Sequence, residues 1–338
     1  MPKSAATTDV KRQDYDIETL DGVSIAVRVV RPVVPGDVGP VPILMLHGTR
    51  PGGRSEFDLP VAGGSLAQDL ALAGHSSIIP DARGYGRSER PISMTQPPQQ
   101  SRPFARCMEI TRDIDAAVDE LRRVTGADRI ALMGWGVGAT AVLAHATLWP
   151  EKISHLVLYN PLYGGGTSHP RYRDHPLEDP AHPGRFNAEH YGGYSYNDPR
   201  MLMDKWDKSI PIDDKDAWRD PAVATAFAAE LLASDATSSE RDPATYRSPN
   251  GMLEDSYFIG KGVALVHASQ VYAKVLIIRP EMDYFARPED VAALRSDLVN
   301  APRVELYEPK NATHFVLLDR AERGRAEAIA KIIEFIRA

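Results

Sequence analysis

The sequence contains one cysteine, Cys107, among 338 residues. It therefore has no internal disulfide and no cysteine-based metal site, which suits a protein of a reducing compartment. Basic residues are also not in excess, because 39 Lys and Arg stand against 46 Asp and Glu, for a formal net charge of −7. This balance leaves no global basic footprint, so nucleic acid is not an expected partner.

Long uninterrupted apolar runs are missing too. The longest apolar stretch, residues 131–149, contains glycines, polar residues and a histidine. A buried strand followed by a buried helix explains it better than a membrane span. The first 14 residues lack the apolar segment of a signal peptide. We therefore expect a cytoplasmic protein that does not bind a membrane. There is no G-x-G-x-x-G motif and no P-loop, so no cofactor is expected.

A further absence lies where catalysis would be expected. Residues 130–138 read I-A-L-M-G-W-G-V-G, an apolar run that enters a tight glycine turn, and a stretch of small residues follows. This is the strand–turn–helix context of a nucleophile elbow, whose usual spelling is G-x-S-x-G. The middle position here is Gly136, so the attacking hydroxyl is missing.

Strand patterns alternate with helix patterns along most of the chain, which predicts a mostly parallel, doubly wound α/β sheet flanked by helices. The Asp21-Gly22 turn predicts a hairpin between residues 14–20 and 23–30. The other expected strands are residues 41–46, 76–80, 130–133, 153–159, 275–279 and 304–307. The expected helices of this part are residues 63–74, 104–124, 139–148, 288–298 and 320–336.

The alternation breaks in the middle of the chain. Residues 161–268 are rich in Pro, Gly, Asp and Tyr, with helical pieces near 198–206, 222–232 and 253–269. We interpret this block as a mainly helical cap inserted into the sheet domain. The predicted organisation is a first core part at 1–160, a cap at 161–268 and a second core part at 269–338.

Several landmarks follow predicted strands, where the loops of a parallel sheet converge on ligand sites. They are H-G-T at 47–49, D-A-R-G-Y-G-R-S at 81–88, G-W-G-V-G at 134–138, I-R-P-E-M-D ending at Asp283, and N-A-T-H-F-V-L-L-D around His314. Together these motifs resemble the α/β-hydrolase superfamily over about residues 15–337. One departure is Pro280, which stands where that family usually has glycine.

The resemblance implies a carboxylic ester hydrolase of the Ser-His-Asp type, with a small-molecule ester as its substrate. A serine at position 136 would attack, with His314 as its base and Asp283 orienting the histidine. The backbone N–H groups of Thr49 and Val137 would form the oxyanion hole. Every part of this machinery except the hydroxyl is present in the sequence.

Three interpretations of Gly136 remain open. In the leading one, the chain is an inactivated nucleophile-to-glycine variant that can still hold substrate. In the second, glycine belongs there and the His314–Asp283 dyad acts alone, as a lyase or by activating water. In the third, the pocket binds a ligand without catalysis.

Candidate substrate contacts are Gly48, Arg50, Trp135 and Tyr163, although packing is the favoured interpretation of Trp135, beside the elbow. Arginine holds carboxylates bidentately, so Arg50 or Arg54 could bind an acidic group on the substrate. The competing interpretation is a surface salt bridge, for example with Glu56 or Asp58.

Other polar and aromatic residues carry weaker expectations. Glu281 competes with Asp283 for the role of the catalytic acid, and Asp81 is expected to stabilise its own turn. Four histidines of the middle block are spaced too irregularly to predict a metal site: His169, His175, His182 and His190. A group of aromatic residues in the same block could wall a pocket or form the core of the cap: Tyr191, Tyr194, Tyr196, Trp206 and Trp218. The sequence predicts no oligomeric state.

Overall fold

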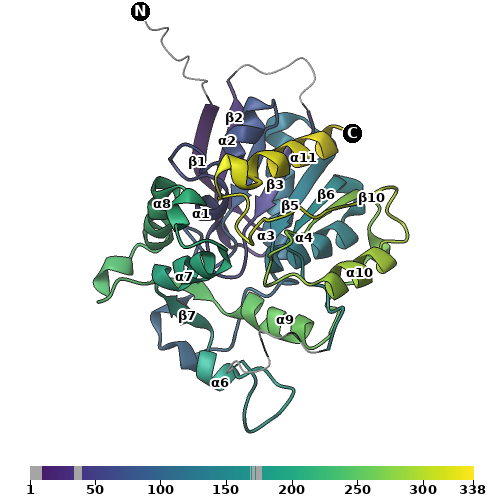
Figure 1. Cartoon of the computed structure of the whole chain (residues 1–338). Helices are drawn as coiled ribbons and strands as arrows, with labels where there is room; N and C mark the ends of the chain where they lie inside the picture. Colours follow the sequence, from purple (N-terminus) through teal and green to yellow (C-terminus); the bar gives the residue numbers. More distant parts are fainter. Residues whose placement is uncertain (1–9, 34–39, 168, 170–171, 173–176) are drawn as a thin grey trace, which may run out of the picture.

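The computed structural model describes residues 10–33, 40–167, 169, 172 and 177–338. Its centre is an eight-stranded sheet in the order β1-β2-β4-β3-β5-β6-β9-β10 (Figure 1). The predicted hairpin is its antiparallel edge, and the strands from β4 to β10 are parallel. The bounds are β1 (Val10–Glu18), β2 (Ser24–Pro32), β3 (Ile43–Leu46), β4 (Ser77–Pro80), β5 (Ile130–Trp135), β6 (Ile153–Tyr159), β9 (Lys274–Ile278) and β10 (Val304–Tyr307).

The central strands are buried on both faces because helices cover the sheet on both sides. In β3, Leu44 and Leu46 contribute to one hydrophobic core, whereas Ile43 and Met45 contribute to the other. This alternation is the two-residue period of a strand, and full burial explains why these strands read as continuous apolar runs.

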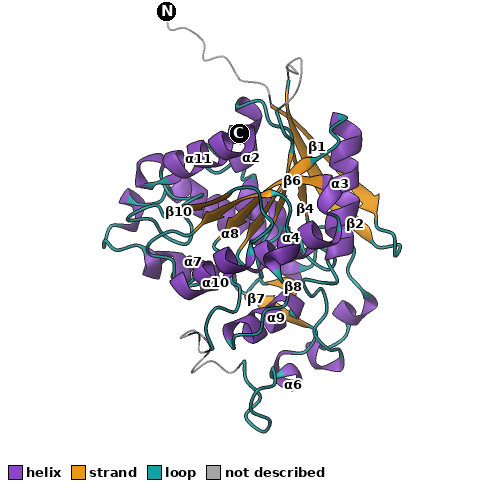
Figure 2. Cartoon of the chain, turned by 90° about the vertical axis from the view of Figure 1, so that its right-hand side faces the viewer, coloured by secondary structure: helices purple, strands orange, loops and turns teal. Residues whose placement is uncertain are grey.

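Two groups of helices form the outer layers, which Figure 2 shows on either side of the sheet. One layer contains α2 (Leu66–Leu72) and α11 (Arg325–Arg337). The other contains α3 (Thr111–Thr125), α4 (Val137–Leu148) and α10 (Pro288–Asp297). The short helix α1 (Gly53–Phe57) follows β3. A mostly parallel sheet between two helical layers confirms the predicted fold class.

The chain between β6 and β9 forms an insertion that lies below the sheet in Figure 1. Its described residues form four α-helices and, unlike the expected cap, also a two-stranded antiparallel sheet. Its described helices and strands are α6 (Ala188–Tyr191), β7 (Tyr194–Asn197), α7 (Pro199–Ser209), α8 (Pro221–Ala233), β8 (Tyr246–Pro249) and α9 (Gly251–Gly260). Part of the insertion is packed on the sheet domain, because Trp206 of α7 stacks on Phe315 with ring centroids 5.1 Å apart.

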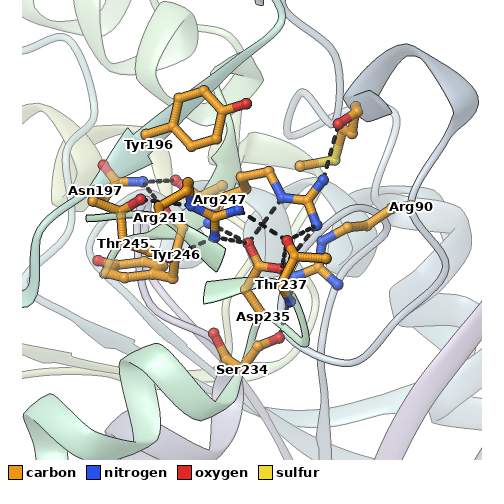
Figure 3. A network of polar contacts seen from close by, with 12 residues as sticks. Arg90, Tyr196, Asn197, Ser234, Asp235, Thr237, Arg241, Thr245, Tyr246 and Arg247 are labelled. Atoms are coloured by element: carbon orange, nitrogen blue, oxygen red, sulfur yellow. Dashed lines mark hydrogen bonds and ion pairs between the residues drawn. The ribbon is translucent and has the colours of Figure 1, made fainter. Parts of the chain in front are cut away.

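A charged network stabilises the small sheet of the insertion (Figure 3). The buried carboxylate of Asp235 pairs with Arg241 at 2.9 Å and with Arg247 at 2.8 Å. Arg247, in β8, also donates to the Met94 carbonyl at 2.9 Å. The network therefore ties the insertion to the chain segment after β4.

Two expected helices are too long: the one at residues 253–269 ends at Gly260, and the one at residues 104–124 starts late. Helix α3 begins only at Thr111, because the preceding residues are held by other contacts. The amide of Ala105 donates to Glu109 at 2.7 Å, and the amide of Cys107 donates to Asp255 of α9 at 2.6 Å. Helical periodicity could not reveal these bonds, which fix the segment in turns.

Across the described residues, none of the helices combines the length and apolar character needed to cross a membrane.

Candidate active site

The turn between β5 and α4 has the backbone of a nucleophile elbow. Gly136 has φ 59° and ψ −120°, a conformation that side chains rarely adopt, and it caps the N-terminus of α4. Positions 134 and 138, on either side, have no space for a side chain and therefore require glycine. A Cβ on Gly138 would lie 2.2 Å from the His47 carbonyl oxygen, and one on Gly134 would lie 2.4 Å from the Gly138 oxygen.

The middle glycine is different. A Cβ on Gly136 would meet no atom closer than a ring carbon of Phe285, at 3.6 Å. That is ordinary van der Waals contact, so the site has room for a side chain at this position. The only steric requirement for glycine at 136 is the positive φ, which is the usual strain of an elbow nucleophile.

A histidine and a carboxylate meet beside Gly136. Nδ1 of His314, after β10, lies 2.7 Å from Oδ1 of Asp283, after β9. The Asp283 side chain is fully buried and also accepts bonds from the amides of Phe285 at 2.8 Å and Ala286 at 3.2 Å. These donors fix the carboxylate, so that it orients the imidazole with Nδ1 as the donor.

The other ring nitrogen of His314 is therefore the acceptor. The indole N–H of Trp135 donates to His314 Nε2 at 3.2 Å. His314 lines the same cavity as Gly136, so the histidine lies beside the elbow, and Nε2 can take a proton from a nucleophile only after it releases the bond from Trp135. This tautomer is the one that a general base at this position requires.

Two residues that sequence reasoning missed fix the histidine loop. Tyr159, the last residue of β6, donates to the carbonyl oxygen of His314 at 2.6 Å, and Asn160 donates to the same oxygen at 2.8 Å. Asn160 has φ 53°, which is unusual for a residue other than glycine. The sequence could have indicated both residues, because they stand at the carboxyl end of a predicted parallel strand, where site residues gather.

The loop after β3 forms the opposite wall of the site. Gly48, Thr49 and Arg50 all line the cavity. The amide of Gly48 donates to Oε2 of Glu56 at 2.8 Å, and the Tyr85 hydroxyl donates to the Thr49 carbonyl at 3.0 Å. These bonds hold the loop from behind. Val137 is the first residue of α4, so its N–H has no partner within the helix.

The cavity itself has a volume of about 60 Å³. Its walls come from the loop after β3, the elbow, α7 and the loops that carry Asp283 and His314. Leu202, Phe285 and Phe315 provide apolar contacts, Arg50 and Lys205 provide cationic side chains, and Glu56 provides a carboxyl group. The site is thus a small pocket with polar groups in an apolar lining, as is typical of small-molecule sites.

The two arginines of the H-G-T-R-P-G-G-R segment point to different places. Arg50 lines the cavity and donates from Nη1 to Asn250 at 3.1 Å. Arg54 pairs with Asp14 of β1 at 3.2 Å. Neither forms the expected salt bridge with Glu56 or Asp58, because Asp58 is engaged by Arg12 and Arg28 instead.

Tyr163, unlike the other predicted substrate contacts, does not line the cavity. Its hydroxyl donates to Asp297 at 2.7 Å and accepts from the amide of Ala268 at 2.8 Å. The ring belongs to the core cluster that contains α3 and α4, and it does not line the cavity. Tyr163 follows β6 closely in sequence, which suggested that it lies at the site. Its phenol ring instead points toward α10.

Other candidates can be placed directly. Glu281 is exposed, pairs with Lys310 at 3.1 Å and accepts from the amide of Asn311, so it does not compete with Asp283 for the histidine. Asp81 accepts bonds from the amides of Gly53 and Arg87, as expected for a structural residue.

The described residues contain no metal-binding group of His, Cys, Asp and Glu. His175 lies outside the described residues.

Two tryptophans of the insertion are buried packing residues and do not line the cavity. Trp206 and Trp218 donate their indole N–H groups to the buried carboxylate of Asp319, at 2.8 and 3.1 Å. Asp319 also accepts from Thr313 at 2.7 Å. Burial raises the pKa of Asp319 to about 6, against the lowering effect of these bonds. This carboxyl therefore connects the insertion to the loop that carries His314.

Comparisons with known proteins agree with this fold. The model of the alpha/beta hydrolase family matches residues 43–328. A 2-hydroxy-6-oxononadienedioate/2-hydroxy-6-oxononatrienedioate hydrolase of Klebsiella pneumoniae is 29% identical over 127 residues, which are 37% of this chain. The match spans only 36% of that relative's own length.

Solved structures show the same fold at low identity. The E-2-(acetamidomethylene)succinate hydrolase structure has a TM-score of 0.61 at 20% identity and covers 97% of this chain and 100% of its own. An esterase from Exiguobacterium antarcticum has a TM-score of 0.59 at 14% identity, with 96% and 100% covered.

Proposed function

The chain belongs to the alpha/beta hydrolase family, and we propose that its site binds a small carboxylic ester and lacks only the attacking hydroxyl of an acyl-enzyme hydrolase. The observation that carries this proposal is the geometry of Gly136. It has the strained backbone of an elbow and room for a side chain, whereas its neighbours Gly134 and Gly138 have none.

The chemistry follows from the groups around that position. A hydroxyl on residue 136 would give its proton to Nε2 of His314 and attack the ester carbonyl carbon. Asp283 would stabilise the imidazolium, and the N–H groups of Thr49 and Val137 would receive the oxyanion. Without the hydroxyl, the same site holds the ester without acylation, as in a nucleophile-to-glycine variant.

A second candidate function rests on the orientation of His314. Nδ1 is bound to Asp283, so Nε2 is the basic nitrogen, and the residue lines the cavity beside Gly136. A water molecule in the space of the absent side chain could give its proton to this nitrogen and attack without a covalent intermediate. The dyad of His314 and Asp283 would then act as a water-activating hydrolase or, on a carbon acid, as a lyase.

The insertion supplies one side of the proposed site. Leu202 and Lys205, both on α7, line the cavity opposite Gly136 and His314. This supports the assignment of residues 161–268 as a cap over the ester and of the flanking parts as the hydrolase core.

The cationic side chains that line the pocket favour a substrate with a negative charge. Arg50 and Lys205 both line the cavity, and the name of the Klebsiella pneumoniae relative specifies a dioate substrate. We propose that the ester carries a carboxylate and that Arg50 contacts it.

The test compares the chain with Gly136→Ser on a panel of short acyl and aryl esters. The acyl-enzyme proposal predicts a gain on restoring the hydroxyl, on the order of the 10⁶-fold lost when a triad nucleophile is removed. Turnover by the unaltered chain that disappears in His314→Ala would favour the second candidate instead. No turnover by either protein would contradict both.

A further inference from the structure

Glu56 of α1 is a buried carboxyl group that the proposed chemistry does not use. Its side chain lines the cavity together with Gly136 and His314, and the residue is 5% exposed. Among the described residues, it forms no ion pair with an arginine, lysine or histidine. A buried carboxylate without a cation is costly, so the neutral acid is favoured.

The hydrogen bond from Gly48 decides where the proton lies. The Gly48 amide donates to Oε2 at 2.8 Å, so Oε2 must be an acceptor. In the neutral acid, the hydrogen therefore resides on Oε1, for which the described residues provide no hydrogen-bond partner. Because the side chain lines the cavity and Oε2 is occupied, the Oε1–H group is the one left for a bound molecule.

We propose that Glu56 is a further catalytic residue, which donates a hydrogen bond from Oε1 to the carbonyl oxygen of the bound substrate. This inference rests on the proposed function, because it assumes that the cavity binds a carbonyl compound. It adds a side-chain acid to the backbone donors of Thr49 and Val137, and it pairs that acid with His314 as the base.

The electron and proton movements balance with Glu56 as a donor only. The nucleophile, a hydroxyl or water, gives its proton to His314 and forms a bond to the carbonyl carbon. The π electrons move to the carbonyl oxygen, whose new charge strengthens its bond from Oε1–H without removing the proton. On collapse, the carbonyl re-forms, the ester C–O bond breaks, and the alkoxide takes the proton from His314.

The pH dependence has a definite sign. Burial raises the pKa of Glu56 to about 8, so the donor is present below that pH and is lost above it. The charged or titratable residues that line the cavity with the carboxyl are Arg50, Lys205, Tyr284 and His314, and Tyr246, whose pKa is raised by burial, is close enough for Glu56 to raise that pKa further. Arg54 and Asp58 share the segment of Glu56, but both are engaged in ion pairs elsewhere.

The experiment measures binding, so it does not depend on turnover. The probes are acetophenone and α-methylstyrene, which have the same shape and differ by the carbonyl oxygen. Their dissociation constants are measured by calorimetry from pH 6.5 to 9.5, on the unaltered chain and on Glu56→Gln. Glutamine keeps an acceptor for Gly48 and a donor for the probe but does not titrate.

We expect acetophenone binding to weaken about fivefold as the pH rises through about 8, the effect of one lost hydrogen bond. Glu56→Gln should remove this dependence, and α-methylstyrene should not show it. Glu254→Gln is the matched control, because burial also raises the pKa of Glu254, on α9 outside the cavity. It should behave like the unaltered chain.

Three results would overturn the inference: acetophenone binding that is independent of pH, an equal pH effect on both probes, or no preference for the ketone over the alkene at any pH. The titration of the unaltered chain decides the question even where a variant does not fold. An active Gly136→Ser protein with pH-independent ketone binding would overturn this inference alone. An inactive one with pH-dependent binding would overturn the proposed function alone.

Discussion

Two glycines of the elbow, Gly136 and Gly138, should respond differently to the same added methyl group. In Gly138→Ala, the new Cβ would lie 2.2 Å from the His47 oxygen, whereas ordinary contact begins at 3.4 Å. The backbone must therefore move by about 1.2 Å, the difference between these two distances. Backbone rather than a flexible side chain has to yield, so we expect a loss of more than about 3 kcal/mol in the free energy of unfolding.

Gly136→Ala should be less costly, because its Cβ would only touch Phe285 at 3.6 Å. The cost that remains is the strained φ and ψ, about 1–3 kcal/mol. Gly126 provides a matched control, with φ 72° at the end of α3 and no atom within 4 Å of an added Cβ. Gly126→Ala should cost about 1–2 kcal/mol through its left-handed conformation alone.

The assay is urea unfolding of the three variants, followed by tryptophan fluorescence and far-ultraviolet circular dichroism. The expected order of destabilisation is Gly138→Ala well above Gly136→Ala, with Gly136→Ala near Gly126→Ala. A loss for Gly136→Ala as large as that for Gly138→Ala would refute the reasoning, because position 136 would then require glycine for space.

Three further predictions concern the polar groups around the site. In the Gly136→Ser background, Asp283→Asn should lower kcat by about 10⁴ with little change in KM, since the histidine tautomer is lost; a fall of less than tenfold in ester turnover would contradict this. Arg50→Ala should raise KM for esters that carry a carboxylate and leave neutral esters of the same size unaffected, with Arg54→Ala as the control; equal losses on both esters would exclude a clamp. The raised pKa of Asp319 means that its contribution to stability is complete below about pH 4 and is lost as the pH rises through about 6. The stability of the chain relative to Asp319→Asn should therefore decline over that range in urea titrations, by about 1.4 kcal/mol per unit of pKa difference, and a constant difference would contradict the pKa.

Local patterns in the sequence predicted the sheet well. The apolar strand runs and the turn glycines placed β3, β5 and β6 within a few residues, because each strand is buried on both faces. The insertion was harder, since β7 and β8 are about 50 residues apart and lack a clear alternating pattern. Their pairing depends on long-range contacts such as the network around Asp235, which no local pattern reveals.

The same distinction applies to the site. Asp283 and His314 could be proposed together because each has a recognisable loop motif after a strand, and the structure places them 2.7 Å apart. Glu56 has no such motif and appeared only as a partner for an arginine. Its position in the cavity follows from the fold of the loop after β3, which brings the Gly48 amide onto its carboxyl. Tyr163 lies away from the cavity although it follows β6 closely in sequence, because its hydroxyl is held by Asp297 and by the amide of Ala268.

The central claim is that this site is a serine-hydrolase site without its hydroxyl, and trapping the acyl-enzyme tests it most directly. Gly136→Ser would be mixed with a 4-nitrophenyl ester, quenched within one turnover and measured by intact-protein mass spectrometry. We expect an adduct with the mass of the acyl group, located on residue 136, which is absent from the unaltered chain and from Gly136→Ser with His314→Ala. A folded Gly136→Ser protein that hydrolyses none of the esters and forms no adduct would contradict the claim.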